Sequence, residues 1–153
     1  MENTNIIIEK MQQKHIDSIA EIEKECFFMP WSAESLREEL LNDTSLFYVI
    51  ENGDQVMGYI GSNNVLGEIY IDNIAIKNEY RRKGYGEKLL KYLISEGISK
   101  KADFITLEVR KSNSNAINLY EKLGFKNVGI RKNFYKNPKE DGIIYTLYLK
   151  DRW

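Results

Sequence analysis

The stretch Tyr80–Leu90, YRRKGYGEKLL, places basic residues and two glycines directly before a helical apolar pattern. Because Ile69–Ile76 is an apolar, β-branched run, the stretch is expected to join a strand to the N-terminus of a helix. The first amides of a helix have no partner inside it, and the positive end of the helix dipole lies there. Gly84 and Gly86 allow the backbone to approach phosphate oxygens. The charge at the rim comes from Arg81, Arg82 and Lys83. The pattern predicts a diphosphate-binding turn.

Other phosphate-binding turns fit this stretch less well. The string GxxxxGK[ST] of nucleoside triphosphatases does not occur in the sequence. A dinucleotide-binding turn needs GxGxxG, but Leu89 stands where the third glycine would be, and the order of the preceding strands also differs. The alternative to a diphosphate site is a solvated basic turn in which the glycines only cap the helix.

The composition is that of a globular protein with a hydrophobic core. The chain has 153 residues, 42% hydrophobic and 29% charged, with a formal net charge of -1 at pH 7. A balanced charge gives no global attraction to nucleic acid or to a membrane, and three cations in one turn contact few phosphates. No apolar run approaches the ~20 residues of a membrane span, and the N-terminus lacks a signal-peptide layout. We expect residues 1–153 to form one domain in the cytoplasm.

Periodicity and turn signals predict the element order β-α-α-β-β-β-α-β-α-β-β, an α/β (α+β) fold with helices on the faces of a sheet. The expected strands are Asn5–Met11, Leu46–Glu51, Val56–Ser62, Gly67–Ile76, Phe104–Val109, Phe125–Arg131 and Ile143–Leu149. The expected helices are His15–Phe27, Ala33–Leu41, Gly84–Lys100 and Ser114–Leu123. Ser32 is expected to cap the second helix, and Asn52-Gly53-Asp54 is a hairpin turn signal.

The single histidine and the single cysteine lie in the first predicted helix. We expect His15 on the surface at the start of that helix. Cys26 is expected to be a buried structural thiol, because His15 lies too far along the helix to activate it. A nucleophilic cysteine that forms a covalent intermediate is the alternative, and the structural role is preferred. One cysteine allows no internal disulfide and no cysteine-based zinc site.

Two blocks of sequence resemble the GCN5-related N-acetyltransferase (GNAT) family. Arg81–Gly86 resembles the family's [Q/R]-x-x-G-x-[G/A] motif, which there binds the diphosphate of acetyl-CoA. Asp72–Ile76, DNIAI, looks like the strand whose backbone receives the pantetheine arm and directs an amide at the thioester carbonyl. Leu107–Asn113, LEVRKSN, and Ala116–Phe125, AINLYEKLGF, look like the family's second block. The resemblance covers essentially the whole chain and implies the GNAT fold, a single mixed sheet of about six or seven strands with helices on both faces.

This resemblance implies acetyl-CoA as the cosubstrate and no metal. The residues it assigns to acetyl-CoA are Ile74, Ala75, Ile76, Arg81, Arg82, Lys83, Gly84, Tyr85, Gly86, Glu87 and Asn113. Asn113 also fits a plain helix N-cap, and both roles are compatible.

Acetyl transfer to an amine needs a base, stabilisation of the carbonyl oxygen, and a proton for the leaving thiolate. Glu108 ends the apolar run Phe104–Leu107, and a carboxylate half withdrawn from water is a better base near neutrality. The alternatives for Glu108 are a solvated strand-end charge or an ion pair with Arg110. Tyr120 faces inward on its helix and is a candidate acid, or else a core tyrosine. The resemblance implies that Tyr120 donates the proton to coenzyme A.

The acceptor is expected to be an α-amine. With a pKa of about 8, an α-amine is roughly one-tenth neutral at pH 7, whereas a lysine at about 10.4 is far less so. A single modest base therefore suits an α-amine better than a lysine side chain.

Phe28–Ser32, FMPWS, and Arg131–Asp141, RKNFYKNPKED, resemble segments of RimI-type members of the family. Those enzymes acetylate the N-terminal alanine of a small-subunit ribosomal protein. The chain departs from the family pattern at Met29, Phe134 and Gly142, and these departures bear on peptide preference more than on acetyl transfer. The aromatic residues expected to form walls for the first residues of a peptide are Phe28, Trp31 and Tyr135, with core packing as their alternative.

Three functions follow. A RimI-type N-terminal acetyltransferase is preferred, which acts on a ribosomal protein by direct transfer in a ternary complex and without an acyl-cysteine intermediate. For it, Glu140 and Asp141 are expected to form an acidic rim for a cationic N-terminus. An acetyltransferase for a small amine is the second possibility. A non-catalytic acyl-CoA-binding module is the third, and the presence of both Glu108 and Tyr120 argues against it. No sequence feature indicates an oligomeric state.

Overall fold

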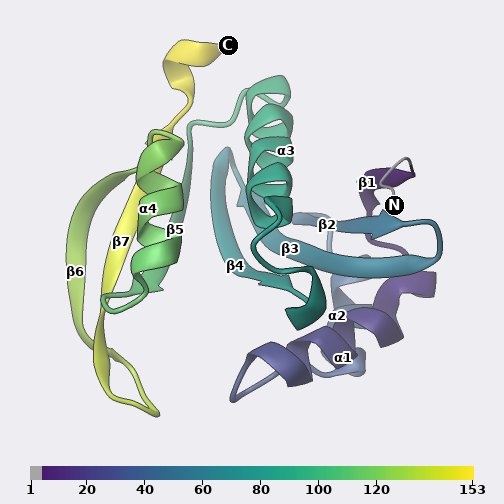
Figure 1. Ribbon diagram of the computed structural model, residues 1–153. Helices are drawn as coiled ribbons and strands as arrows, with labels where there is room; N and C mark the ends of the chain where they lie inside the picture. Colours follow the sequence, from purple (N-terminus) through teal and green to yellow (C-terminus); the bar gives the residue numbers. More distant parts are fainter. Residues whose placement is uncertain (1–4) are drawn as a thin grey trace.

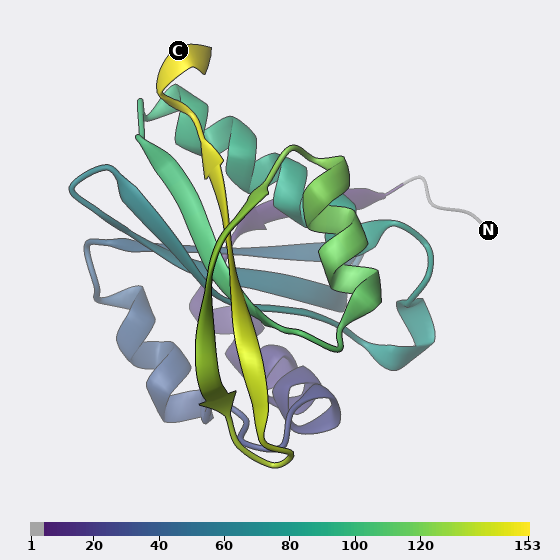
Figure 2. The same cartoon turned by 90° about the vertical axis from the view of Figure 1, so that its left-hand side faces the viewer.

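The computed structural model describes residues 5–153, within which seven strands form one mixed sheet with helices on both faces (Figures 1 and 2). The strands are β1 (Ile6–Lys10), β2 (Ser45–Asn52), β3 (Gln55–Val65), β4 (Glu68–Ile76), β5 (Phe104–Arg110), β6 (Lys126–Tyr135) and β7 (Glu140–Tyr148). The helices are α1 (Ile16–Cys26), α2 (Ala33–Leu40), α3 (Tyr85–Ser99) and α4 (Ser114–Lys122), with short 3-10 turns at Gln13–His15, Asn78–Tyr80 and Lys150–Arg152. The predicted fold class and order of elements are confirmed.

The sheet has its shortest strand pairing at its centre, between residues 68–70 of β4 and 104–106 of β5, and this junction is called the seam. The strand order is β1-β2-β3-β4-β5-β7-β6, and β4 and β5 form the parallel pair. Their pairing covers only residues 68–70 against residues 104–106, after which the strands diverge. The register between β3 and β4 skips Asp72, which is therefore a bulge just past the last β4–β5 pair. Figure 1 shows the resulting separation between the β1–β4 part and the β5–β7–β6 part.

Each face of the sheet has its own apolar core. α3 contributes Leu89, Leu90 and Leu93, all fully buried, to the core on one face, as the helical spacing predicts. On the other face, Ile16 and Ile19 of α1 are buried in the second core. Figure 2 shows α1 and α2 on one side of the sheet and α3 and α4 on the other. Burial of such a side chain contributes about 1.5–3 kcal/mol, so the two cores hold the parts around the seam in place.

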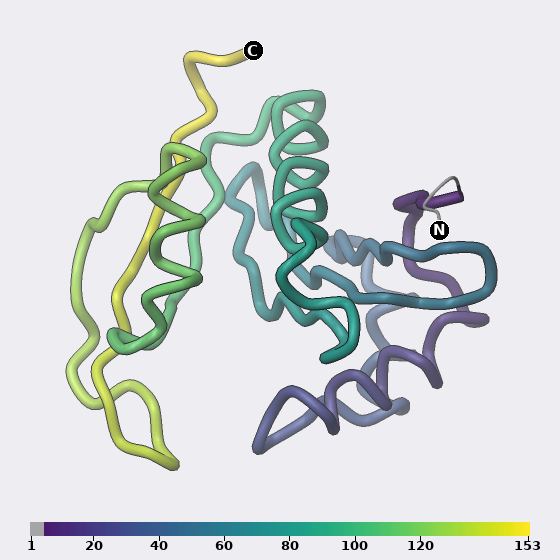
Figure 3. Tube along the Cα trace, viewed as in Figure 1, coloured from purple at the N-terminus to yellow at the C-terminus, as the bar shows by residue number. Residues whose placement is uncertain are grey.

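The local turn signals are confirmed. The Ser32 hydroxyl accepts a hydrogen bond from the backbone N–H of Ser35 at 3.1 Å and caps α2. The hairpin between β2 and β3 turns at Gly53, which has a φ of 61°. The chain trace in Figure 3 shows how the segment after β4 turns back into α3, which leads to β5 across the seam.

The expected surface position of His15 is wrong. Its side chain is buried, and its Nδ1 accepts a hydrogen bond from the backbone N–H of Gln12 at 2.9 Å. Nε2 lies 2.9 Å from a carboxylate oxygen of Glu51 and 3.3 Å from one of Glu9. These two partners come from β2 and β1, so the burial of His15 depends on strand pairing that its own helix pattern does not reveal.

The expected strands Phe125–Arg131 and Ile143–Leu149 are too short at the ends that connect to each other. β6 and β7 extend to Tyr135 and Glu140, which are register partners, so the connection is a short turn. The Asp141 carboxylate accepts a hydrogen bond from the backbone N–H of Asn133 at 2.9 Å. The polar composition of this segment therefore belongs to an exposed hairpin at the sheet edge.

None of the helices in residues 5–153 is long and apolar enough to cross a bilayer.

Gly61 is required by an aromatic stack on the α1 face. The Phe47 ring lies between Trp31 and Tyr59, with centroid separations of 5.7 and 6.1 Å. A Cβ at position 61 would lie 2.6 Å from the Phe47 ring. We predict that Gly61→Ala lowers the free energy of unfolding by about 1–3 kcal/mol through overpacking, measured by urea denaturation. Gly129→Ala is the matched control, because its added Cβ would make only an ordinary 3.5 Å contact. Equal stability changes in the two variants would refute this explanation.

Candidate functional site

The turn before α3 has the geometry of an anion site. Gly84 is the N-cap of α3 with a φ of 84°, and Arg82 has a φ of 65°. Among the described residues, no side chain caps this helix, so its first amides remain available. Arg82 and Lys83 are exposed. The positive helix end, the free amides and these two cations coincide, as the sequence predicts for a diphosphate-binding turn.

Arg81 is hydrogen-bonded to the elements that surround the turn. Its Nε donates to the carbonyl of Ile76 at 3.0 Å, and its Nη2 lies 3.0 Å from the Sγ of Cys26. Arg81 thus ties the turn to the end of β4 and to the end of α1. Cys26 is half-buried, so the prediction of a buried thiol is only partly correct. Burial raises the pKa of the Cys26 thiol, and the nearby Arg81 opposes that shift.

A cleft of about 640 Å³ opens where β4 and β5 separate. It brings together seven of the predicted site residues: Ile74, Glu108, Asn113, Tyr120, Phe28, Trp31 and Tyr135. The other predicted cofactor residues, Ala75, Ile76 and residues 81–87, do not line this cleft. Residues 81–87 follow β4 and run into the first turn of α3. Asn113 also caps α4, because its Oδ1 accepts a hydrogen bond from the Ala116 N–H at 3.2 Å.

The base and acid candidates come from opposite faces of the sheet. Alternation along β5 directs Leu107 and Val109 to the core beneath α3 and α4, so Glu108 projects to the face of α1 and α2. Tyr120 belongs to α4 and to the core on the first face. The cleft therefore passes through the sheet, and two ligands could approach its centre from opposite sides.

Glu108 is half-buried and forms an ion pair with Arg131, whose Nε lies 3.0 Å from its Oε2. The expected alternative of a pair with Arg110 is wrong, because Arg110 bonds to Glu140 at 3.1 Å. Arg131 lies on β6, two strands away from β5, and the sequence offers no signal for this contact. A residue that fixes the orientation of the candidate base was therefore missed.

Arg110 and Glu140 organise the β6–β7 hairpin beside the cleft. The Arg110 guanidinium lies 4.5 Å from the centroid of the Tyr135 ring. Glu140 accepts hydrogen bonds from Arg110 and from the Ser112 N–H, at 3.1 and 2.6 Å. Hydrogen bonding to Ser112, with a smaller contribution from Arg110, lowers the pKa of Glu140. The expected acidic rim is wrong, because neither Glu140 nor Asp141 lines the cleft. Glu140 accepts from the Ser112 N–H outside the hairpin, and Asp141 accepts from the Asn133 N–H within it.

Gly142, one of the departures from the resembled segments, packs against two aromatic rings. A Cβ at Gly142 would lie 3.2 Å from the ring of Phe134 and 3.3 Å from that of Tyr135. Gly142 thus leaves room for the two aromatic rings, which pack edge to face with their centroids 5.0 Å apart.

Tyr120 is held in an environment that keeps its proton. Its side chain is buried against Phe125 and Tyr145, with ring centroids 5.6 and 6.3 Å away. Burial, with a smaller effect of Tyr135, raises the pKa of Tyr120 to about 12. A neutral phenol at the cleft can donate a proton across the physiological pH range.

A buried carboxylate beneath the cleft was missed by the sequence analysis. Glu23 of α1 is fully buried and accepts hydrogen bonds from the Trp31 N–H, the Tyr59 hydroxyl and the Asn73 side chain. Burial raises the pKa of Glu23, and these hydrogen bonds oppose the shift. Its spacing from Ile16 and Ile19 puts it on the apolar stripe of the helix, and that is the signal that could have identified it.

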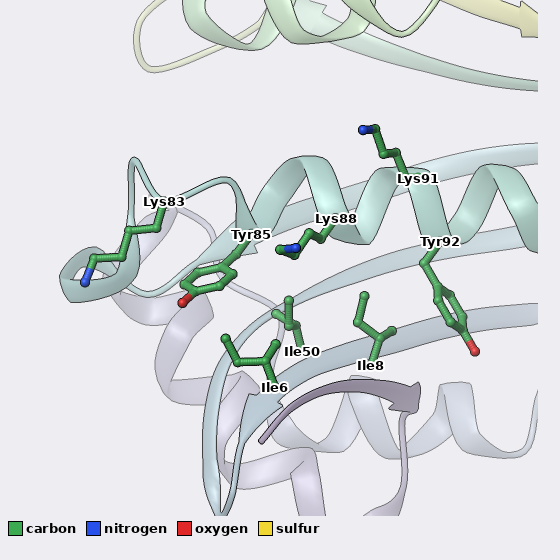
Figure 4. Close-up of a pocket in the computed structure, with 8 residues that line it drawn as sticks. All are labelled: Ile6, Ile8, Ile50, Lys83, Tyr85, Lys88, Lys91 and Tyr92. Carbon is green, nitrogen blue, oxygen red and sulfur yellow. The ribbon is translucent and has the colours of Figure 1, made fainter. Parts of the chain in front are cut away.

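A larger cavity of about 840 Å³ lies between α3 and the strands β1 and β2 (Figure 4). Its floor is formed by Ile6, Ile8 and Ile50, and the picture shows Lys91 extending away from them. Neither Glu108 nor Tyr120 lines it. The smaller cleft is therefore the candidate site for chemistry.

Glu9, His15 and Glu51 place ligand-type atoms within 4.8 Å of one another, but their protonation does not suit a metal ion. Because Nδ1 of His15 accepts a backbone hydrogen bond, a neutral imidazole carries its proton on Nε2, toward the carboxylates. In this tautomer the Nδ1 lone pair accepts the Gln12 N–H and Nε2 carries a proton, so the imidazole has no lone pair left for a metal ion.

Comparison with known proteins agrees with this geometry. The sequence model of the acetyltransferase (GNAT) family matches residues 16–125. A relative from Bacillus subtilis is 39% identical over 149 residues, which cover 97% of this chain and 99% of the relative. The [ribosomal protein bS18]-alanine N-acetyltransferase of Haemophilus influenzae is 36% identical, over 94% of this chain and 99% of that enzyme.

A solved structure gives the same result. The ribosomal-protein-S18-alanine N-acetyltransferase from Escherichia coli superposes with a TM-score of 0.87 and 31% sequence identity, covering 94% of each chain. The family match includes the basic turn, β4, β5 and α4, which form the seam and its surroundings. The chain therefore belongs to the acetyltransferase (GNAT) family.

Proposed function

We propose that this chain is an N-terminal acetyltransferase that transfers an acetyl group from acetyl-CoA to the α-amine of the N-terminal alanine of ribosomal protein bS18. The observation that carries the proposal is the cleft through the seam, which joins a carboxylate, a buried phenol and aromatic walls. The names of the relatives from Haemophilus influenzae and Escherichia coli support this acceptor. We place the activity in one domain, residues 1–153, and in the cytoplasm, where ribosomes are made.

The residues around the seam fit acetyl-CoA. Beyond Tyr70, the edge of β4 that faces β5 has no strand partner within residues 5–153, so its backbone groups before Ile76 are free to bond the amides of the pantetheine arm. The Ile76 carbonyl is excluded, because it accepts the hydrogen bond from Arg81. A Cβ at Gly84 would meet no atom within 4 Å, so the space in front of the turn is open for a diphosphate. Arg82 and Lys83 would supply charge there. When bound, acetyl-CoA supplies the activated thioester.

The chain's own residues then handle protons and charge. Glu108, oriented by Arg131, takes the proton from the incoming ammonium, directly or through a water molecule. A backbone amide of the segment 74–76 stabilises the developing charge on the carbonyl oxygen. Tyr120 holds a proton that passes to the departing sulfur, since its raised pKa keeps the phenol neutral. Transfer is direct, and Cys26 has no part in it.

The acceptor peptide would be received on the opposite face by aromatic side chains. Phe28 is 78% exposed, whereas Trp31 and Tyr135 are half-buried. An exposed phenylalanine at the mouth of a cleft gains its burial only when a ligand covers it. These three residues therefore act as walls for the first residues of the peptide.

The substrate assignment is tested with purified protein and a panel of amines. A peptide with the N-terminal sequence of bS18 should be acetylated with a much higher kcat/KM than free polyamines or amino acids. Mass spectrometry should place the acetyl group on the α-amine of the alanine. Preference for a small amine, or acetylation of lysine side chains alone, would contradict the proposed acceptor.

Removal of either proton-transfer group should slow turnover. We predict that Glu108→Gln and Tyr120→Phe each lower kcat about a hundredfold or more, because general acid or base catalysis contributes that much. Steady-state assays with saturating acetyl-CoA measure the effect. Glu34→Gln and Tyr148→Phe are matched controls on exposed positions and should retain full activity. Unchanged turnover in the two site variants would refute the assigned roles.

The pH profile follows from the raised pKa of Tyr120. We predict that kcat/KM rises from about pH 6 to about pH 9, as the α-amine with its pKa of about 8 loses its proton, and stays level to about pH 10. The phenol remains protonated throughout, because its pKa of about 12 lies above this range. The Tyr120→Phe variant should show the same rise at a lower level. A wild-type loss of activity between pH 8 and 10 that this variant abolishes would contradict the assignment.

Gly84 should be essential for cofactor affinity. Gly84→Ala forces a Cβ into the left-handed region, at a cost of about 1–2 kcal/mol, and directs it into the open space of the turn. We predict about a tenfold or greater loss of acetyl-CoA affinity in titration calorimetry. Gly53→Ala carries comparable strain, with a φ of 61°, in a hairpin far along the chain. If both variants bound acetyl-CoA equally well, the turn would not be the diphosphate site.

A further inference from the structure

We propose that Glu23 is a positioning residue that fixes the acceptor side of the cleft by holding the α1–α2 loop against β4. The inference rests on the proposed function, because it concerns how that site receives a peptide. Glu23 itself does not line the cleft. It acts through Trp31 and Asn73, which both do.

The carboxylate joins three separate elements. Its Oε1 accepts a hydrogen bond from the backbone N–H of Trp31 at 2.8 Å, in the α1–α2 loop. Its Oε2 accepts one from the Tyr59 hydroxyl of β3 at 2.6 Å and one from the Asn73 side chain of β4 at 3.2 Å. All three partners are donors, and Glu23 is fully buried. A charged acceptor is therefore matched by this pocket, and a neutral amide is not.

These contacts determine the shape of the cleft from two directions. The loop residues 27–30 span the distance from the end of α1 to Trp31, so anchoring Trp31 sets where Phe28 and Met29 can lie. The Trp31 ring is held separately by Phe47, with centroids 5.7 Å apart. Asn73 follows the bulge at Asp72, where β4 leaves β5. One carboxylate thus links the peptide wall to the strand that forms the seam.

The acetyl-CoA side should be less affected by loss of this link. The backbone of β4 at Asn73 is also held by its pairing with Gly61 of β3. The basic turn is anchored by hydrogen bonds from Arg81 to Ile76 and Cys26, in which the Glu23 carboxylate takes no part. A change at Glu23 should therefore separate peptide binding from cofactor binding.

The test uses Glu23→Gln, which keeps the size of the side chain but places an NH₂ group against a donor. We expect the KM for the alanine peptide to rise about tenfold, while the Kd for acetyl-CoA changes less than about twofold. We also expect hydrogen exchange of the Trp31 amide, followed by NMR, to become at least about tenfold faster. The exchange readout needs no substrate.

Ile19→Val is the control for a merely structural effect. It lies on the same helix, is fully buried in the same core, and should lower the melting temperature without changing the peptide KM. An unchanged peptide KM in an active Glu23→Gln variant would overturn the inference, and so would an equal rise in KM in Ile19→Val. Inactivity of the wild-type protein toward the peptide would instead overturn the proposed function, and the inference with it.

Discussion

The structure depends on one interruption in an otherwise continuous sheet. β4 and β5 pair over only three residues each before they diverge, and the bulge at Asp72 marks where β4 leaves the pairing. A parallel pair in the middle of a sheet normally buries its backbone groups against each other. Here the divergence leaves backbone groups of β4 and β5 without a strand partner at the seam in the described part of the chain, and the cleft opens there between the two apolar cores. Glu108 and Tyr120 can meet at one cleft only because the sheet is open at this point.

The surrounding elements hold the opening at a fixed shape. Leucines of α3 on one face, and isoleucines of α1 on the other, keep the β1–β4 part rigid. On the far side, Arg110 and Glu140 fasten the β6–β7 hairpin, while Gly142 makes room for the aromatic rings at its tip. On the side of α1, the buried carboxylate of Glu23 fastens the α1–α2 loop to β4 through Trp31 and Asn73. Polar contacts of this kind specify geometry in a way that apolar packing alone does not.

Much of this architecture could be predicted from local sequence. The order of elements, the α3 stripe, the Ser32 cap and the basic turn follow from periodicity and turn chemistry within short windows. Two of the errors share one physical cause, since they depend on contacts between residues distant in sequence. His15 is buried by carboxylates of β1 and β2, and Glu108 is paired by Arg131 across an intervening strand. The burial of Glu23 could have been predicted from the helical pattern. A carboxylate among the apolar residues on one face of a helix must be hydrogen-bonded to buried donors.

The central claim is that free main-chain amides at the basic turn, together with the open edge of β4, hold acetyl-CoA. Amide hydrogen exchange with and without acetyl-CoA tests it most directly, because it reports on these N–H groups themselves. The account predicts that exchange slows on binding at residues 82–87 and along residues 71–76, with little change on β1 and β2. Saturating acetyl-CoA that left both segments unprotected, or that protected β1 and β2 beside the larger cavity instead, would contradict it.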